Sequence, residues 1–276
     1  MLFYEICIKN KGKILALNIA TWNINSVRLR VDLVCKLLKQ EDIDVICLQE
    51  CKSPIDKIPM DVFSELGFSN LVARGQKGYN GVAIISKIPL LEKSAFDFAG
   101  LGHARHIAAQ LANGIIIHNF YVPAGGDEPD RLKNEKFDQK LNYLAGMREH
   151  FYKNVPEKSI LVGDLNIAPL PQDVWDHKKM VRIVSHTQVE IDHLEAVQKA
   201  GNWVDVIRKD IPATKLYSWW SYRAKDWDAS DRGRRLDHIW ASADIASSTG
   251  GSRIMREARG WERPSDHVPV FATINL

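Results

Sequence analysis

Two polar pairs, Asp164 with Asn166 and Asp266 with His267, border apolar segments of this chain. The first pair follows the apolar residues 160–162, and the second pair opens the chain's last apolar segment. Proteins with α/β folds place chemistry at strand ends, because the sheet is rigid and the loops are free to vary. A carboxylate, an amide and an imidazole at such positions indicate a hydrolase that uses a metal ion.

Other strand candidates end in the same way. Asn23 and Asn25 follow residues 15–22, Glu50 follows residues 44–48, Tyr121 ends residues 114–121, and Asp237 interrupts the apolar residues 236–241. A single aspartate at a strand end is more often a turn former or a helix cap than a catalyst. A carboxylate beside an apolar strand is costly unless it is paired or binds a metal, so repeated cases indicate a shared purpose.

The elements that must position these residues follow from hydrophobic periodicity. Strands are predicted at residues 15–22, 44–48, 70–73, 82–86, 107–111, 114–121, 159–163, 236–241 and 268–274, and amphipathic helices at residues 27–40 and 129–153. This order mixes β–α–β units with hairpins, which favours a mixed sheet or a pair of sheets flanked by helices. The segments 22–25 and 164–167 look alike, but they do not by themselves establish an internal repeat.

The composition is that of an ordinary globular protein. The 276 residues are 45% hydrophobic and 26% charged, with a net charge of +3 and a pI near 8.6. This net charge does not by itself indicate a nucleic-acid partner, although a local cluster of cations could still bind nucleic acid. No segment is apolar enough to span a membrane, and residues 1–19 do not resemble a signal peptide. The four cysteines lack a zinc-site spacing, and buried free thiols at Cys35 and Cys47 fit a reducing, cytoplasmic setting.

Six motifs in this order resemble the exonuclease III-type AP endonucleases of the endonuclease/exonuclease/phosphatase superfamily. They are Trp-Asn-Ile-Asn at 22–25, Leu-Gln-Glu-Cys-Lys at 48–52, Gln-Lys-Gly-Tyr-Asn-Gly-Val-Ala at 76–83, Gly-Asp-Leu-Asn-Ile-Ala-Pro at 163–169, Arg-Leu-Asp-His at 235–238 and Ser-Asp-His-Val-Pro-Val at 265–270. The resemblance covers residues 15–274 and implies an α/β four-layer sandwich, with two mixed β-sheets packed face to face and helices on both outer sides. One domain over residues 14–276 is expected, with an N-terminal extension at residues 1–13.

The resemblance also implies a reaction. Such enzymes cleave the DNA backbone 5′ to an abasic site and leave a 3′-hydroxyl, with Mg²⁺ or Mn²⁺ as cofactor. Glu50, with Asn23 and Asp266, would hold the metal, which prefers hard oxygen ligands. Asp164 would handle the attacking water, Asn166 would donate to the phosphoryl oxygen, Asp237 would orient His267, and Tyr121 would donate to the phosphate or leaving group. Whether Asp164 or His267 takes the water's proton is left open.

Substrate contacts are expected elsewhere in the chain. The residues predicted to bind DNA are Arg28, Lys52, Arg74, Gln76, Lys77, Tyr222 and Arg223. By resemblance, Trp219 and Leu236 would form the pocket for a sugar without its base, because extruding a sugar costs least where the base is missing. Arg234 stands where relatives often carry an apolar or aromatic residue, which makes the pocket of this chain unusual.

Two other classes share this pattern of residues. A phosphatase acting on lipids or inositol phosphates could use the same metal centre, and a non-catalytic DNA-binding relative could keep the fold. The Gln-Lys-Gly and Arg-Leu-Asp stretches disfavour the former, and the complete acid set disfavours the latter. The expected partner is therefore double-stranded DNA with abasic sites or 3′ ends, bound by a cytoplasmic monomer. Exonuclease and 3′-phosphodiesterase activities fit the same pattern, and the sequence does not set their balance or the number of metal ions.

Overall fold

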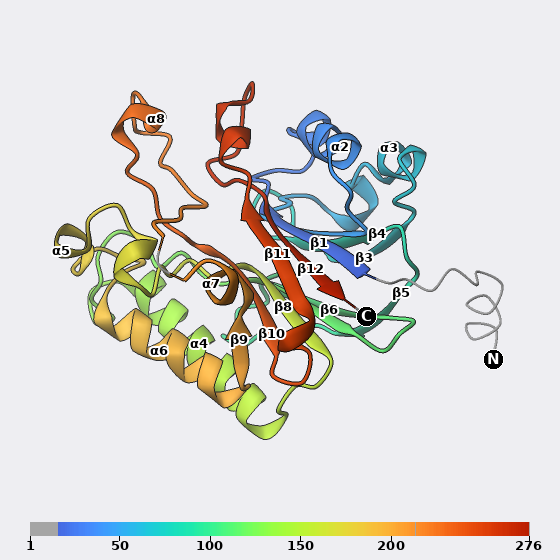
Figure 1. Ribbon diagram of the computed structural model, residues 1–276. Helices are drawn as coiled ribbons and strands as arrows, with labels where there is room; N and C mark the ends of the chain where they lie inside the picture. Colours follow the sequence, from blue (N-terminus) through green and yellow to red (C-terminus); the bar gives the residue numbers. More distant parts are fainter. Residues whose placement is uncertain (1–15, 213, 276) are drawn as a thin grey trace.

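Two six-stranded sheets form the centre of the computed structural model, which describes residues 16–212 and 214–275 (Figure 1). The first sheet has the order β11 (Thr249–Ile254), β12 (Val270–Asn275), β1 (Ala16–Asn23), β2 (Val45–Gln49), β4 (Val82–Ser86) and β3 (Asn70–Arg74). The second has the order β5 (Leu90–Ser94), β6 (His106–Leu111), β7 (Ile116–Tyr121), β8 (Ser159–Asp164), β10 (Asp237–Ser242) and β9 (Trp203–Asp205). Both sheets are mixed, so the predicted pair of mixed sheets is confirmed.

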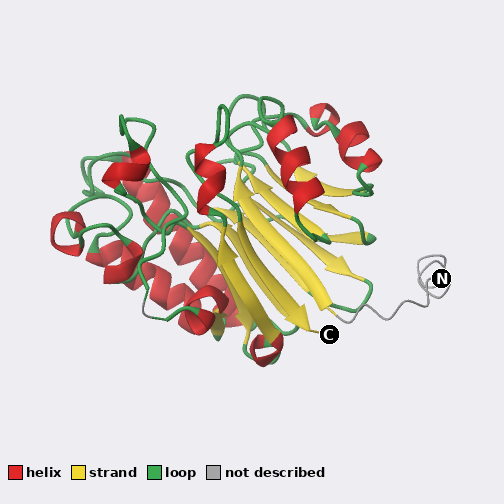
Figure 2. Cartoon of the chain, turned by 45° about the horizontal axis from the view of Figure 1, so that its top comes forward, coloured by secondary structure: helices red, strands yellow, loops and turns green. Residues whose placement is uncertain are grey.

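Helices cover both outer faces of the sheet pair (Figure 2). On the first sheet, α2 (Val31–Gln40) and α3 (Met60–Glu65) bury Leu37 and Phe63 against Trp22 of β1. On the second, α4 (Glu135–Lys153) and α6 (Gln188–Ala200) pack against Phe120 and Leu161. The remaining helices are the short α5 (His177–Met180), α7 (Val206–Asp210) and α8 (Trp227–Ser230) and the 3₁₀ turns Ile55–Lys57, Pro171–Asp173, Ala246–Ser248 and Arg256–Gly260. The predicted four-layer sandwich is therefore confirmed.

The alternation of side chains along each strand explains where the polar strand ends point. Leu17 and Ile19 of β1 and Ile160 and Val162 of β8 belong to one core between the sheets. Side chains two residues apart share a face. Residues 23 and 164 therefore lie in phase with that core, and so do Tyr121 after Ile117 and Asp237 before Ile239. The core-facing side chains of these strands are therefore apolar along most of the strand and polar at the strand end.

The two sheets share one pattern of strand directions. In each, a single parallel pair, β1–β2 or β7–β8, has two antiparallel partners on either side. The loops after β1 and β8 also match: the N–H of Asn25 donates to Asn23 Oδ1 at 3.1 Å, and the N–H of Asn166 donates to Asp164 Oδ1 at 2.9 Å. The likeness of segments 22–25 and 164–167 thus has a structural counterpart.

Several elements differ from the sequence-based prediction. The helix predicted over residues 27–40 begins at Val31, after the N-cap Arg30, because a turn that starts with Asn25 and Ser26 at φ of 49° and 88° precedes it. The helix predicted over residues 129–153 begins at Glu135, after the N-cap Asn134. Strands β5, β9 and β11 and helix α6 were not predicted; β5 is largely exposed and polar, β9 has three residues, and β11 contains glycines.

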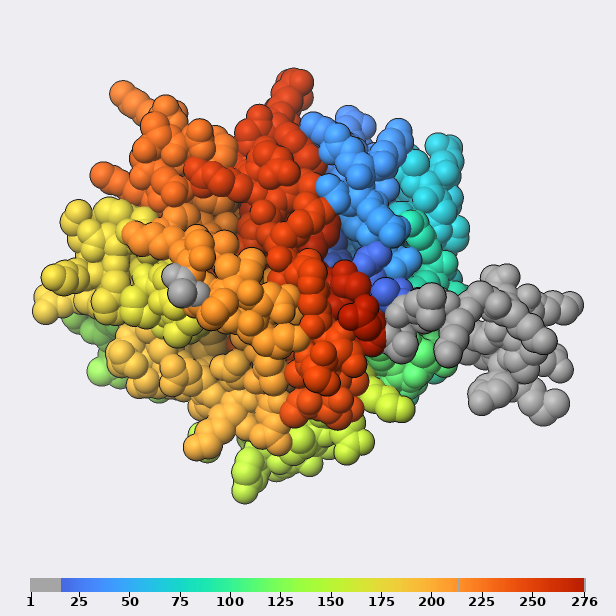
Figure 3. All heavy atoms as spheres, in the orientation of Figure 1, coloured from blue at the N-terminus to red at the C-terminus, as the bar shows by residue number. Residues whose placement is uncertain are grey.

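The structure describes the C-terminal strands of the chain but not residues 1–15. On the face drawn in Figure 3, the C-terminal strands, in red, lie between the N-terminal part in blue and residues of the second half in orange. The predicted extension at residues 1–13 lies outside the described residues. Within the described residues, no helix is both long and apolar enough to cross a membrane. Cys35, Cys47 and Cys51 are buried free thiols, as predicted for the first two.

A buried charge network fixes the segment that leads into β10. Arg235, which is fully buried, donates through Nε to Asp173 at 2.6 Å and pairs with Asp205 at 2.9 Å. Arg208 also pairs with Asp173 at 2.5 Å. Burial alone would raise the pKa of Asp173, but Arg235 and Arg208 hold that pKa below its ordinary value. The network therefore holds Arg235, the residue before Leu236, in a fixed position.

Removal of Asp173 is expected to destabilise the fold in a pH-dependent way. A carboxylate whose pKa is depressed in the folded state adds stability above its unfolded pKa, and this stability is lost as the pH falls. Asp173→Asn should lower the free energy of unfolding by about 3–5 kcal/mol at pH 7, because two buried arginines lose their partner. Urea denaturation from pH 6 to pH 3 measures both effects. The exposed control Asp56→Asn should leave the curve unchanged, and an equally steep acid loss in both variants would contradict the assignment.

Candidate active site

The polar strand ends meet in one hydrogen-bonded group. Asn23, fully buried at the end of β1, donates through Nδ2 to Glu50 Oε1 at 3.0 Å and to Asp164 Oδ2 at 2.9 Å. Tyr121, at the end of β7, donates its hydroxyl to the same Glu50 oxygen at 2.7 Å. Because β1 is parallel to β2 and β7 to β8, both parallel pairs end at this edge. The sheet geometry therefore gathers residues from both halves of the chain.

His267 lies between two buried carboxylates. Its Nδ1 is 2.8 Å from Asp237 Oδ2, and its Nε2 is 3.6 Å from Asp164 Oδ2. Burial alone would lower the pKa of His267, but the charges of Asp237 and Asp164 raise it to about 10. Burial raises the pKa of Asp164 to about 7, against the opposing effect of His267. The geometry favours a protonated imidazolium, with both ring nitrogens directed at carboxylates.

Asn166 holds the Asp164 carboxylate from the other side. Its backbone N–H donates to Asp164 Oδ1 at 2.9 Å, and its side-chain amide donates to Asp164 Oδ2 at 3.1 Å and to the carbonyl of Val122 at 2.9 Å. The amide that the sequence assigned to a substrate oxygen therefore also orients the neighbouring acid.

Glu50, at the rim of the site, has three polar partners. Besides Asn23 and Tyr121, it pairs through Oε2 with the Lys52 ammonium at 2.8 Å. Burial alone would raise the pKa of Glu50, but the hydrogen bonds from Lys52 and Asn23 lower it on balance. Burial, together with the charges of Glu50 and Asp164, raises the pKa of Tyr121 well above its ordinary value. Glu50 is thus ionised, and Tyr121 is a hydrogen-bond donor rather than a base.

The donor groups fit a hard divalent cation. One oxygen of Glu50 already binds a cation, the Lys52 ammonium. Asp266 lines the same cavity as Glu50. Asp266 accepts from Trp219 Nε1 at 3.0 Å and from Asn25 Nδ2 at 3.2 Å, which fixes its carboxylate. Carboxylate and amide oxygens suit Mg²⁺.

A second trio could also offer metal ligands. Asp164, Asp237 and His267 have donor atoms within 4.8 Å of one another. Both nitrogens of His267 are directed at carboxylates, and a metal would require a free lone pair on that ring. An imidazolium paired with two carboxylates therefore describes this trio better than a metal site does.

The turns that carry these side chains adopt uncommon backbone conformations. Asn25, Glu50, Lys52 and Asn166 have φ of 49°, 48°, 51° and 54°. Non-glycine residues in this left-handed region carry strain of order 1–3 kcal/mol each and cluster at functional sites. The surrounding hydrogen bonds hold these turns in place.

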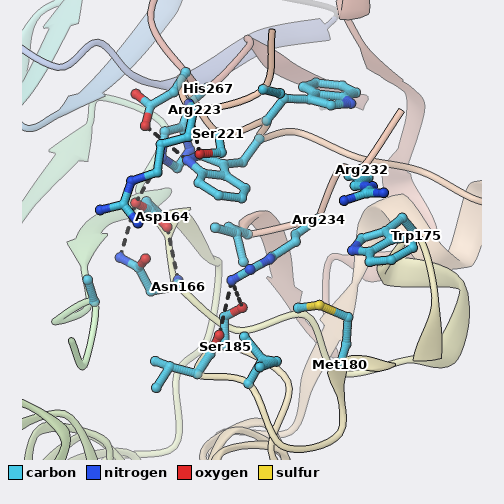
Figure 4. A pocket seen from close by; sticks show the side chains of 18 of the residues that line it. Asp164, Asn166, Trp175, Met180, Ser185, Ser221, Arg223, Arg232, Arg234 and His267 are labelled. Atoms are coloured by element: carbon cyan, nitrogen blue, oxygen red, sulfur yellow. Dashed lines mark hydrogen bonds and ion pairs between the residues drawn. The ribbon is translucent and has the colours of Figure 1, made fainter. Parts of the chain in front are cut away.

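A cavity of about 790 Å³ extends from the acids to an aromatic wall (Figure 4). The three predicted pocket residues, Trp219, Arg234 and Leu236, all line it. Trp175 and Met180, which sequence analysis did not single out, complete an apolar cluster with Leu236. The adjacent Trp220 is 1% exposed, so one tryptophan of the pair is in the core.

The residues predicted to bind DNA fall into two groups. Arg28, Lys77, Tyr222 and Arg223 are exposed, and Arg223 lines the cavity. Lys52 is instead engaged by Glu50 and by Asn25 Oδ1 at 2.6 Å. Gln76 accepts from the backbone N–H of Ala104 at 3.0 Å, and Arg74 donates to the carbonyl of Phe96 at 3.4 Å. Lys52 therefore belongs to the acid site, while Gln76 and Arg74 also support their own loops.

One wall of the cavity comes from a segment that sequence analysis left unassigned. Val184 and Ser185 lie just before α6, whose capping box joins Thr187 and Glu190. The spacing Thr-x-x-Glu was the available sequence signal for this helix start. Beneath this wall, the buried Lys140 of α4 pairs with Glu190 at 2.5 Å and donates to the carbonyl of Asn166 at 2.8 Å. No periodicity marked Lys140 as a support of the acid loop.

Comparisons with known proteins agree with this architecture. Residues 20–267 match the model of the endonuclease/exonuclease/phosphatase family. Exodeoxyribonuclease III of Haemophilus influenzae is 30% identical over 266 residues, covering 91% of this chain and 97% of the relative. The structure of an AP endonuclease from Archaeoglobus fulgidus superposes with a TM-score of 0.87 at 32% identity, covering 94% and 100% of the two chains. A 3′ phosphatase from Neisseria bound to a product DNA hairpin gives 0.86 at 31% identity, with the same coverage. The chain belongs to the endonuclease/exonuclease/phosphatase family, within its exonuclease III-type AP endonucleases.

Proposed function

We propose that this protein is a metal-dependent DNA repair nuclease that hydrolyses the phosphodiester 5′ to an abasic site. The observation that carries the proposal is one cavity with Glu50, Asp164, Asp266 and His267 at one end and an aromatic pocket at the other. A phosphodiester can lie at the acids while the attached sugar enters the pocket. The relatives named above are an exodeoxyribonuclease, an AP endonuclease and a 3′ phosphatase, which supports a DNA substrate and accompanying exonuclease and 3′-phosphodiesterase activity.

Asp164 is the group that takes the proton of the attacking water. His267 is hydrogen-bonded to Asp237 through Nδ1, and its Nε2 lies 3.6 Å from Asp164, so its imidazolium stabilises negative charge on the phosphate, and Asp237 keeps the Nδ1 proton in place. Asn166 orients Asp164 through its backbone N–H, and when substrate is bound its side-chain amide exchanges the 3.1 Å bond to Asp164 for one to the phosphoryl oxygen. Tyr121, held by Glu50, donates to the phosphate or the leaving oxygen.

Glu50 and Asp266, with Asn23 beside them, would hold Mg²⁺, and Mn²⁺ would substitute. When bound, the cation supplies positive charge against the phosphate and the leaving oxygen. Exposed cations, including Arg28, Lys77 and Arg223, contact the DNA backbone. The protein acts as a monomer in the cytoplasm, on double-stranded DNA.

The proposed function is tested with a duplex that carries one tetrahydrofuran residue, a stable analogue of an abasic site. Incision on its 5′ side in Mg²⁺, arrest by EDTA and a 3′-hydroxyl product are expected on a denaturing gel. A duplex without the analogue and an inositol phosphate serve as controls. Hydrolysis of the inositol phosphate without DNA incision would overturn the proposal in favour of a phosphatase. Binding without any cleavage would favour a non-catalytic relative.

Glu50→Ala is expected to weaken the use of metal rather than the binding of DNA. Loss of this ligand should raise the Mg²⁺ concentration for half-maximal incision by at least about 10-fold, since even partners that only support a ligand are worth about 10–100-fold. Mn²⁺ binding followed by electron paramagnetic resonance gives a second readout. The matched control Glu92→Ala, exposed on edge strand β5, should behave as wild type. An unchanged metal requirement in Glu50→Ala would exclude Glu50 as a ligand.

A further inference from the structure

Arg234 is a cation within the pocket wall that lacks an acidic partner. Its Nη1 donates to the carbonyl of Val184 at 3.0 Å and to Ser185 Oγ at 2.8 Å, and its guanidinium lies 4.9 Å from the centroid of Trp219. Its enclosed Nε has no hydrogen-bond partner among residues 16–212 and 214–275. Across those residues, no carboxylate forms an ion pair with it, and Glu190, whose charge acts on it, is already paired with Lys140.

The backbone keeps this side chain in the pocket. Arg234 and Trp219 exchange two backbone hydrogen bonds of 3.0 Å, and Arg234 also bridges Val174. In Figure 4 the guanidinium points toward Ser185, between the group of Asp164 and His267 and the pair of Trp175 and Arg232. Arg234 is thus locked beside the place where the sugar of the scissile residue would enter.

A partly buried guanidinium without an anion is costly to keep. Burial lowers the pKa of Arg234, which reflects the cost of its charged form. Hydrogen bonds to neutral carbonyl and hydroxyl groups compensate only part of that cost. An intact deoxyribose is neutral and offers ether and hydroxyl oxygens, whereas a carboxylate would both neutralise the charge and accept a charge-assisted hydrogen bond. The unpaired cation therefore matches an anionic ligand better than a neutral sugar.

We propose that Arg234 makes the pocket selective for an extruded deoxyribose that has been oxidised to a carboxylate, which pairs with the guanidinium. This specificity rests on the proposed function, and the chemical step is the same. Water adds to phosphorus, the bond between phosphorus and the upstream O3′ breaks, and O3′ takes up a proton. The oxidised residue keeps the phosphate on its 5′ side. Arg234 binds the ligand and takes no part in the proton transfers.

The test compares three duplexes that differ at one residue: a tetrahydrofuran, the ring-opened deoxyribose in which C1′ itself is a carboxylate, and the matching ring-opened residue in which C1′ is a carboxamide. The acid and the amide have nearly the same shape and differ in charge. Wild type should cut the carboxylate with a kcat/KM about 10- to 100-fold above that of the carboxamide, the range of a hydrogen bond to a charged group. In Arg234→Gln this ratio should fall to about 1, and in Arg234→Lys it should lie between.

Arg232→Gln is the matched control. Arg232 lines the same cavity but stacks over Trp175, 4.9 Å from the ring centroid, so its loss should leave the ratio unchanged. A wild-type ratio near 1, or a ratio that survives in Arg234→Gln, would overturn the inference. Faster incision at a 2′-deoxyuridine than at the carboxylate would also overturn it. That result would indicate that Arg234 binds a carbonyl group of an intact base. If Arg234→Gln fails to fold, judged by its melting curve, the Arg234→Lys ratio decides.

The same experiment separates this inference from the proposed function. Failure of the wild type to cut the plain tetrahydrofuran would reject the proposed function itself. Efficient incision of the tetrahydrofuran without discrimination between acid and amide would reject only the role of Arg234.

Discussion

Asp164→Asn is expected to abolish measurable turnover while DNA binding persists. The amide keeps the shape of the side chain, and its oxygen can still accept from Asn23 and Asn166, while the bond from the backbone N–H of Asn166 is lost. It cannot accept the water's proton, and loss of a positioned general base costs about 10²–10⁴ in rate. Single-turnover incision of the tetrahydrofuran duplex measures the loss, and fluorescence anisotropy with EDTA measures binding. For the wild type, the rate should fall as the pH is lowered, because the protonated Asp164 carboxyl is not a base.

Asp127→Asn is the matched control for Asp164→Asn. Asp127 is exposed at the rim of the same cavity and touches none of the buried acids through a hydrogen bond in the described chain. Its variant should retain the wild-type rate and pH profile. If Asp164→Asn lost DNA binding in proportion to its rate, or kept the wild-type rate, its assignment as the base would be wrong.

Asp237→Asn is expected to lower kcat by about 10³–10⁴, comparable to the loss when a buried aspartate that orients a catalytic histidine becomes an amide. Asp237 is fully buried and accepts from both His267 and Ser218, with the Ser218 hydroxyl at 2.6 Å. Its charge is the largest influence that raises the pKa of His267, against the lowering by burial. Without that charge, the pKa of His267 should fall and the imidazolium should be lost at neutral pH.

The pH profile separates this role from simple loss of structure. An imidazolium is present below its pKa and lost above it, so the rate of Asp237→Asn relative to the wild type should rise as the pH is lowered, since protonation of Asp164 slows both enzymes. The wild type should show no loss from His267 until about pH 10. Ser218→Ala removes one hydrogen bond to the same oxygen but keeps the charge, and it should cause a smaller loss without the new pH dependence. A ratio of the Asp237→Asn rate to the wild-type rate that is the same at all pH values would contradict the proposed charge effect.

The strand predictions succeeded where the local pattern carried the information. Strands β1, β4 and β8 were placed to within about a residue, because each is a buried apolar run bordered by polar residues. The start of α2 was placed too early because the helical spacing of apolar residues continues into the preceding turn, where Val27 is buried. Edge strands β5 and β11 were missed, since exposed or glycine-containing segments give a weak periodic signal, whereas α6 was missed although its Thr-x-x-Glu start signal was present.

The sequence by itself determined which residues stand at the strand ends and in what order, and the family followed from those motifs. Alternation along β1 and β8 then required Asn23 and Asp164 to face the shared core. Only the tertiary structure decided the charge state of His267, the engagement of Lys52 with Glu50, and the lack of an acidic partner for Arg234. These properties depend on burial and on charges contributed by distant segments. Local periodicity carries no information about either, so the chemistry of the site was fixed by packing.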